Sequence, residues 1–289
     1  MPGRRLTRKR IPAANALLLL ALVLALVACA SEGQVQEISA DEIRQAVLDA
    51  AEEVQTLRFE TELTVRMQAR GEQDVDLTVS ADSNGQIDNL AQVMVSEMTS
   101  TVYLPPEAGG NKQSTVTSYV VDGVLYARTT KPDQTEQWSS QRMVDWTWED
   151  LSQLGHEAGT LRTAELELLG SGRLRGVDCY LLEVTPNTDN LRQRLEQLPG
   201  LEGLPADEQA ALDELIEEFS TKVWVEKDTF HLLRDETEIT LNLDSDLLAQ
   251  SGAQQNDMTL DAEMRTDFTD YDQPLAIELP PEASGTGSS

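Results

Sequence analysis

The spacing of apolar and polar positions changes along the chain, and each change marks an expected element. Residues 39–57 carry apolar side chains at helical spacing behind a capping box made by Ser39 and Glu42, which predicts a helix. From Arg58 to Gln68 apolar and polar residues alternate. A period of two predicts a strand with one buried face.

The same alternation returns at intervals through the rest of the chain. It predicts strands at residues 75–81, 87–103, 115–122, 124–130, 163–169, 174–185, 221–226, 232–243 and 258–268. Turn-forming residues lie between several of these segments. We therefore predict turns at Asp82-Ser83-Asn84-Gly85 and at Asp122-Gly123, and a hairpin at Gly170-Ser171-Gly172.

Three segments depart from this alternation. Trp138 lies in a polar connection, and a short helix is predicted over residues 140–154. Residues 188–220 are predicted to form a helical insertion, with two helices divided by a break at Pro199-Gly200. Residues 283–289 are rich in Gly and Ser and are predicted to be a disordered tail.

Long alternating strands with few helices predict an α+β fold. We expect a single domain over residues 39–282, built on one large curved antiparallel β-sheet of about ten strands. The sheet should be an open half-barrel, with the helices covering its concave side. The whole chain has 289 residues, which is long enough for one large core with irregular ends.

The N-terminus has the order of a secretory signal. Five basic residues lie between Arg4 and Arg10, and an apolar run of 15 residues follows from Ala16 to Ala30. A run of this length is shorter than the roughly 18 residues or more of a membrane-spanning helix. Cleavage is therefore favoured over a permanent anchor.

The end of that run, Leu26-Val27-Ala28-Cys29, looks like a bacterial lipobox. The resemblance implies residues 1–28 as a lipoprotein signal peptide, cleavage between Ala28 and Cys29, and lipidation of Cys29 by acyl chains such as palmitate. Residues 29–38 would then be the lipidated N-terminus and its tether. The lipid would hold the protein on the extracytoplasmic side of the cell membrane or the outer envelope.

The chain is strongly acidic, with 51 Asp and Glu against 22 Lys and Arg and a formal charge of −29 at pH 7. Removing residues 1–28 removes five basic residues and no acidic one, which makes the mature charge −34. A field of this sign repels nucleic acid and anionic head groups. We therefore expect no nucleic-acid partner, and membrane attachment depends on the lipid at Cys29.

Side chains for covalent chemistry are sparse. His156 and His231 are the only histidines, and neither has a second His or a Cys at the spacing of metal ligands. Cys179 remains after lipidation of Cys29, and its place in an alternating segment is typical of a small buried thiol. Gly170-Ser171-Gly172 lacks the pattern of a nucleophile elbow. We predict no enzymatic activity, no cofactor and no bound metal.

Several segments together resemble one family of envelope proteins. They are the capped helix before Leu57-Arg58-Phe59, residues 119–126, Trp138, and residues 176–184, 223–229, 268–274 and 277–280. In this order the chain resembles the LolA-like superfamily, in particular lipoproteins of the LppX and LprG type. The resemblance implies a half-barrel with helices as a lid over an apolar cavity. It also implies carriage of lipids, lipoglycans or lipoproteins; the long insertion and the acidity leave the cargo open.

The inward positions of the predicted strands are candidates for the lining of such a cavity. They are Leu63, Val65, Met67, Val79, Val95, Val120, Leu125, Leu182 and Leu241. The same residues are equally suited to a solid core.

Two functions therefore remain open from the sequence. The first is an anchored lipoprotein that binds or carries a lipid or other apolar ligand in the half-barrel. The alternative is an anchored interaction or sensor domain without a cavity, which acts through its acidic surface on a basic protein partner.

Overall fold

The computed structural model describes residues 38–70, 74–104, 109–131, 138–144, 146–185, 187, 216–243 and 257–284. The chain divides into two compact units, Met1–Ser39 and Ala40–Ser289. All the helices and strands described below belong to the second unit.

The described elements alternate between one long sheet and a few helices. In chain order they are α2 (Ala40–Glu53), β1 (Thr56–Arg70), β2 (Val75–Asp88), β3 (Val93–Tyr103), β4 (Lys112–Val121), β5 (Val124–Thr130), β6 (Trp138–Arg142), α3 (Trp148–Leu151), α4 (Gln153–Thr163), β7 (Glu165–Leu174), β8 (Val177–Thr185), β9 (Ile216–Glu226), β10 (Leu232–Leu243), β11 (Asp257–Thr269) and α8 (Pro281–Ser284).

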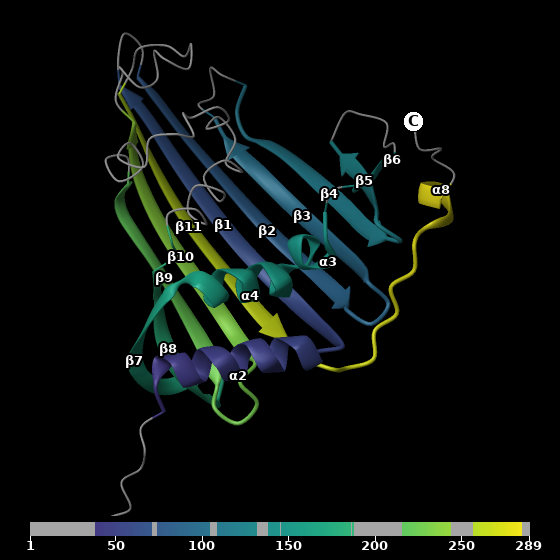
Figure 1. Cartoon of the computed structure of the whole chain (residues 1–289). Helices are drawn as coiled ribbons and strands as arrows, with labels where there is room; N and C mark the ends of the chain where they lie inside the picture. The colour runs from purple at the N-terminus through teal and green to yellow at the C-terminus, as the bar shows by residue number, and fades with distance from the viewer. Residues whose placement is uncertain are drawn as a thin grey trace, which may run out of the picture. The chain divides into compact units, whose positions relative to one another are not determined.

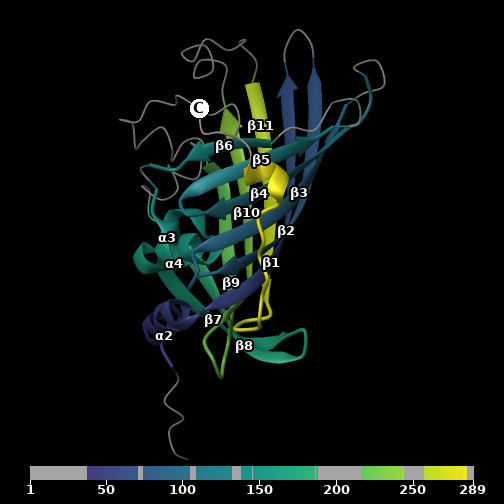
Figure 2. The same ribbon diagram turned by 90° about the vertical axis from the view of Figure 1, so that its right-hand side faces the viewer.

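All eleven described strands form one open antiparallel sheet, in the order β6-β5-β4-β3-β2-β1-β11-β10-β9-β8-β7. The chain enters at the centre with β1 and meanders outward to the edge strand β6. It crosses to the opposite edge through α3 and α4, and then meanders back from β7 to β11. Figure 1 shows α2 and α4 lying across one side of this sheet. The predicted fold class, an open and curved antiparallel half-barrel with helices, is confirmed (Figure 2).

Strand β1 has one polar and one apolar face. Arg58, Glu60 and Glu62 are exposed, whereas Leu57 and Phe59 are buried. Directly opposed residues of antiparallel strands point to the same side, so the register carries this distinction across the sheet. We call the face that carries Leu57 and Phe59 the inner face, and the opposite face the outer face.

Helix α2 forms where the capping box predicts it and buries Ile43 and Val47. It ends at Glu53 rather than at the predicted Leu57. Leu57 already belongs to β1, where it stands opposite Ile87 of β2. Both side chains are fully buried, so sheet pairing at this position overrides the helical spacing.

The turn predicted at Asp82-Ser83-Asn84-Gly85 is wrong, because strand β2 runs straight through it. Gly85 stands opposite Phe59, whose ring fills the space that a side chain at residue 85 would need. Glycine is therefore required by a cross-strand contact and not by a turn. The actual turn is at residues 89–92, inside the strand predicted over residues 87–103.

The hairpin predicted at Gly170-Ser171-Gly172 is also wrong. These residues lie within β7, where a register shift between Leu168 and Gly170 marks a bulge. The chain turns instead at Arg175 and Gly176, which both have positive φ. In contrast, the turn predicted at Asp122-Gly123 is confirmed, with φ values of 51° and 69°.

The helix predicted over residues 140–154 begins too early. Residues 138–142 form the edge strand β6, and Trp138 pairs there with Arg128 of β5. The helices α3 and α4 follow at residues 148–151 and 153–163. Ser152 caps α4 by accepting a hydrogen bond from the backbone N–H of Gly155 at 3.1 Å.

Most of the predicted helical insertion at residues 188–220 lies outside the described residues. Its last part is strand and not helix, because Ile216–Ser220 begin β9 and pair with β10. The disordered tail predicted from Ala283 starts too early as well. Ala283 lies in α8 and is fully buried, while residues 285–289 lie outside the described part.

Candidate ligand-binding site on the inner face of the sheet

The inner face is apolar near the start of β1, just after the chain leaves α2. Leu57 of β1 stands opposite Ile87 of β2, and Phe59 stands opposite Phe268 of β11. All four side chains are 6% exposed or less. This end of the face is ordinary solid core.

Hydroxyl groups cross the inner face next to that core. Thr61 and Thr266 lie opposite each other, with their hydroxyl oxygens 3.1 Å apart. On β10 the hydroxyl of Thr237 donates to the carboxylate of Asp235 at 3.2 Å and lies 2.9 Å from the hydroxyl of Thr221. Thr61 is half-buried and the other groups are buried, and they occupy two neighbouring rows, because Thr237 and Thr221 share the row of Leu63 through Met264. Their polar atoms are hydrogen-bonded within these rows.

Along β1 the inner face is apolar again beyond Thr61, and part of it is only half-buried. Leu63, Val65 and Met67 of β1 project to it, and Val79 of β2 stands opposite Val65. The register adds Leu241, through Leu260, to the row of Met67. Figure 1 shows that α2 and α4 cross the sheet at its other half. We call this region the upper inner face.

The register thus brings five of the nine predicted lining residues together on the upper inner face. Val120 and Leu125 pair with each other on the same face, in the row of Ile87. Leu182 stands opposite Val223, in the row of the buried Asp235. Val120 and Leu182 are buried, whereas Leu125 is half-buried.

The ninth residue, Val95, lies on the other side of the sheet. It stands opposite Gln86 of β2, which itself stands opposite Arg58 on the outer face. Val95 therefore does not share a face with Leu63 or Val65. Whether the other residues line a ligand cavity stays a prediction.

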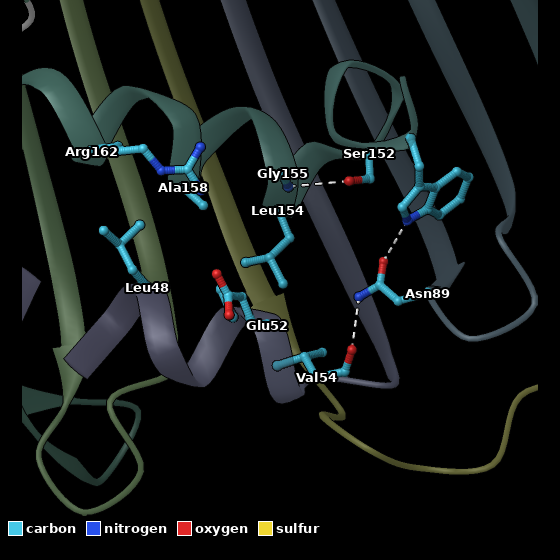
Figure 3. A pocket seen from close by; sticks show the side chains of 11 residues that line it. Leu48, Glu52, Val54, Asn89, Ser152, Leu154, Gly155, Ala158 and Arg162 are labelled. Atoms are coloured by element: carbon cyan, nitrogen blue, oxygen red, sulfur yellow. Dashed lines mark hydrogen bonds between the residues drawn. The ribbon is translucent and has the colours of Figure 1, made fainter. Parts of the chain in front are cut away.

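A hollow that the sequence did not predict lies between α2 and the α3–α4 segment (Figure 3). Its volume is about 250 Å³. Its walls are mainly apolar, and Leu48, Val54, Leu154 and Ala158 contribute to them. The i, i+4 spacing of Leu154 and Ala158 was the only signal in the sequence, because the facing helix lies about 100 residues away in the chain.

Asn89 fixes one wall of this hollow. Its side-chain amide donates to the carbonyl of Val54 at 2.9 Å, and its carbonyl oxygen accepts from the indole N–H of Trp148 at 2.9 Å (Figure 3). The turn after β2 is thereby joined both to the end of α2 and to the start of α3. We call this hollow the helix pocket.

The groups considered for catalysis do not converge. Cys179 is buried, and burial raises the pKa of its thiol, which disfavours the reactive thiolate. The ring of His231 stacks on Tyr271 with centroids 4.2 Å apart, and burial lowers the pKa of His231. Within the described residues there is no group of three or more His, Cys, Asp or Glu side chains placed to hold a metal ion.

Nor does any helix among the described residues have the length and hydropathy needed to cross a membrane.

No protein-family model and no curated protein matches the chain. Several solved structures do. The Mycobacterium tuberculosis lipoprotein LppX is 13% identical, with 82% of this chain and 96% of that chain covered and a TM-score of 0.38. LprF from Mycobacterium bovis is 12% identical, with 84% and 98% covered and a TM-score of 0.41.

A LolA superfamily protein from Nitrosomonas europaea is 13% identical, with 84% of this chain and 96% of that chain covered and a TM-score of 0.22. Solved structures similar to this chain thus include proteins of the group that its sequence pattern resembles.

Proposed function

We propose that this protein is a lipid-anchored, extracytoplasmic envelope protein that binds a lipid or other apolar ligand on the upper inner face of its sheet. In this proposal residues 1–28 are a cleaved signal peptide, Cys29 carries the lipid, and residues 30–38 tether the domain. The protein binds and releases its ligand and makes no covalent change to it. Lipid carriage in the envelope would follow from these properties.

The observation that carries the proposal is the half-buried apolar strip on the upper inner face. Leu63, Val65 and Met67 alternate with polar residues that point to the outer face. Because successive side chains of a strand point to opposite faces, the three apolar side chains share the inner face. From Leu63 to Ala69 the strip extends over seven residues, or about 20 Å.

This length suits a lipid tail. The hydrocarbon core of a bilayer is about 30 Å thick and contains two leaflets, so one acyl chain spans about 15 Å. A chain lying along β1 would thus find apolar side chains over its whole length. The hydroxyl pair of the half-buried Thr61 and the buried Thr266 would mark where the apolar surface ends.

The energetics favour exchange. An acyl chain that leaves a bilayer for an apolar protein surface remains in an apolar environment, so the hydrophobic free energy changes little. The direction of transfer then depends on small differences in contact and on the concentration of lipid on each side. A binding protein of this kind needs no chemical energy source for the binding step itself.

The first test fills the proposed surface. Val65→Trp places a bulky side chain on the upper inner face, whereas Thr64→Trp places the same side chain one residue away on the outer face. We expect uptake of a fluorescent fatty acid by the wild-type protein and by Thr64→Trp, and at least tenfold weaker uptake by Val65→Trp. Equal uptake by both variants contradicts ligand binding at this site.

The anchor is tested separately. Bacteria that express the full chain are grown with an alkyne-labelled palmitate analogue, and the protein is then examined for label and for its fractionation with membranes. We expect label and membrane association in the wild type and neither in Cys29→Ser. Label that persists in Cys29→Ser contradicts lipidation at this residue.

A further inference from the structure

Large apolar side chains are unevenly exposed on the surface. Six are exposed among the described residues, and the three with the highest exposure are Leu90 at 83%, Val144 at 78% and Trp146 at 53%. Leu90 lies in the turn between β2 and β3, while Val144 and Trp146 lie between β6 and α3. Exposure of this kind on two loops that lie at the same end of the sheet is typical of a surface that contacts another partner.

These three residues lie at the same end of the sheet. The backbone N–H of Met143 donates to the carbonyl of Gly123 at 3.0 Å, which joins the connection after β6 to the β4–β5 turn. The bond from Trp148 to Asn89 joins the same connection to the β2–β3 turn. We call Leu90, Val144 and Trp146 the apolar loop cluster.

The chemistry of the cluster is that of a membrane interface. Tryptophan prefers the head-group level of a bilayer because its ring is apolar while its indole N–H remains hydrated, and aliphatic side chains insert beside it. The charged residues nearest in the chain are mostly acidic: Asp145 lies between Val144 and Trp146, and Asp88 lies two residues before Leu90, whereas Arg142 is the one basic residue beside them. The cluster is therefore suited to neutral head groups, because acidic residues are repelled by anionic ones.

The size of the cluster also favours a bilayer over a protein. A stable protein interface involves roughly 20–30 residues on each side. Three side chains on two loops fall far short of that, but a bilayer has no fixed shape to match and can receive them individually. Such contacts are weak alone and become effective when another link already holds the protein at the membrane.

That link would be the lipid on Cys29, so the inference rests on the proposed anchoring. Ser39 lies ten positions after Cys29 in the chain, which limits their distance to about 36 Å. Helix α2 has 14 residues and is about 21 Å long. The β2–β3 turn lies at its C-terminal end, where the N–H of Asn89 donates to the carbonyl of Gln55 at 2.7 Å. Both ends of α2 are thus within reach of a bilayer that contains the anchor.

We infer that the apolar loop cluster inserts into the interface of the bilayer to which the protein is anchored. The helix pocket lies directly behind this cluster, because Asn89 and Trp148 line it. Docking through the loops holds that pocket and the inner side of the sheet in a defined orientation to the bilayer.

The test uses the full mature, lipidated protein in phosphatidylcholine vesicles, made with or without bromine on the acyl chains. Bromine quenches tryptophan only at close range, so the difference between the wild type and Trp146→Phe reports Trp146. We expect brominated chains to reduce the Trp146 emission at least twofold. The double variant Leu90→Asp/Val144→Asp should abolish this quenching, whereas Leu169→Asp, an exposed apolar residue of β7 at the other edge of the sheet, should not.

Sedimentation of the same samples separates the two proposals. Protein that sediments with vesicles but shows no bromine quenching of Trp146 overturns the docking inference and leaves the anchor intact. Protein that remains in the supernatant overturns both. A blue shift of Trp146 that grows with protein concentration and needs no vesicles shows that a second copy covers the cluster, which also overturns the inference.

Discussion

Phe59 of β1 and Gly85 of β2 stand directly opposite each other, and the Phe59 ring occupies the space of the missing side chain at residue 85. A Cβ there would also lie 2.9 Å from the carbonyl oxygen of Val95, which is backbone and cannot rotate away. Gly85→Ala should therefore lower the free energy of unfolding by about 1–3 kcal/mol. Urea unfolding measures the loss.

The control for this prediction is Gly172→Ala. A Cβ at residue 172 meets nothing within 4 Å, so the unfolding midpoint should change little. Phe59→Leu combined with Gly85→Ala should recover part of the lost stability, because the smaller side chain makes room. Equal midpoints for Gly85→Ala and the wild type would show that the ring and the added methyl do not compete.

Asp267 on the outer face joins several basic side chains. It accepts hydrogen bonds from Arg234 at 2.8 and 3.0 Å and lies 3.6 Å from both Arg175 and Arg265. The Asp267 side chain is only 11% exposed. Asp267→Ala removes the shared acceptor from these partly buried cations and should cost about 2 kcal/mol. Thermal and urea unfolding measure the change.

The Arg173–Asp178 pair is the matched control. Its atoms are 2.7 Å apart, as close as those of the first pair, but its side chains are 70% and 63% exposed. Asp178→Ala should cost less than about 1 kcal/mol. Similar losses in the two variants would mean that distance, and not burial, determines the contribution of these ion pairs.

His231 should make stability depend on pH. Burial lowers the pKa of His231, although the carboxylates of Asp272 and Glu226 oppose the shift. The unfolded chain therefore takes up this proton at a higher pH than the folded protein does. The stabilising contribution is complete above pH 6.5, the ordinary pKa, and is lost progressively as the pH falls below it.

The measurement is the free energy of unfolding at about pH 7.5 and about pH 5.5, on either side of the ordinary histidine pKa. His231→Phe keeps an aromatic ring against Tyr271 and cannot be protonated. The decrease in stability between the two pH values should be smaller in this variant than in the wild type. The same decrease in both proteins would exclude His231 as a source of the pH dependence.

Asn89 should be important for the helix pocket. Asn89→Ala removes the hydrogen bonds that the carbonyl of Val54 and the indole N–H of Trp148 make with this side chain. The free energy of unfolding should fall by about 1–3 kcal/mol. Asn89→Asp keeps an acceptor for Trp148 but loses the donor to Val54, so an intermediate loss is expected. Faster hydrogen exchange in α3 of Asn89→Ala would confirm that the bond fixes this segment; unchanged exchange would contradict it.

The fold was predictable where the alternation of side chains was unambiguous. Leu63, Val65 and Met67 alternate with polar residues, and the register places all three on the inner face as expected. Val95 belongs to a run in which Val93, Met94 and Val95 are all apolar. Such a run has no period of two, so the face of Val95 is decided by its pairing with the neighbouring strands β2 and β4.

The errors at glycines have a different origin. Gly85 looks like a turn residue, but its function is to admit the ring of Phe59 from a neighbouring strand, 26 residues earlier. Gly170 accompanies a bulge in β7. The helix pocket was missed for the same reason, because α2 and α4 meet only in three dimensions. Local patterns predict elements, whereas contacts between distant segments decide how a given residue is used.

The central position of β1 and β11 has a consequence for how the protein is made. Their thirteen register pairs, from Arg58 with Thr269 to Arg70 with Asp257, join the first and the last strand. During synthesis β1 to β6 can form a sheet by local hairpins, but one long edge of β1 stays without its partner until β11 has emerged. The nascent chain therefore carries an aggregation-prone edge for most of its synthesis, and premature termination before residue 257 would leave that edge permanently open.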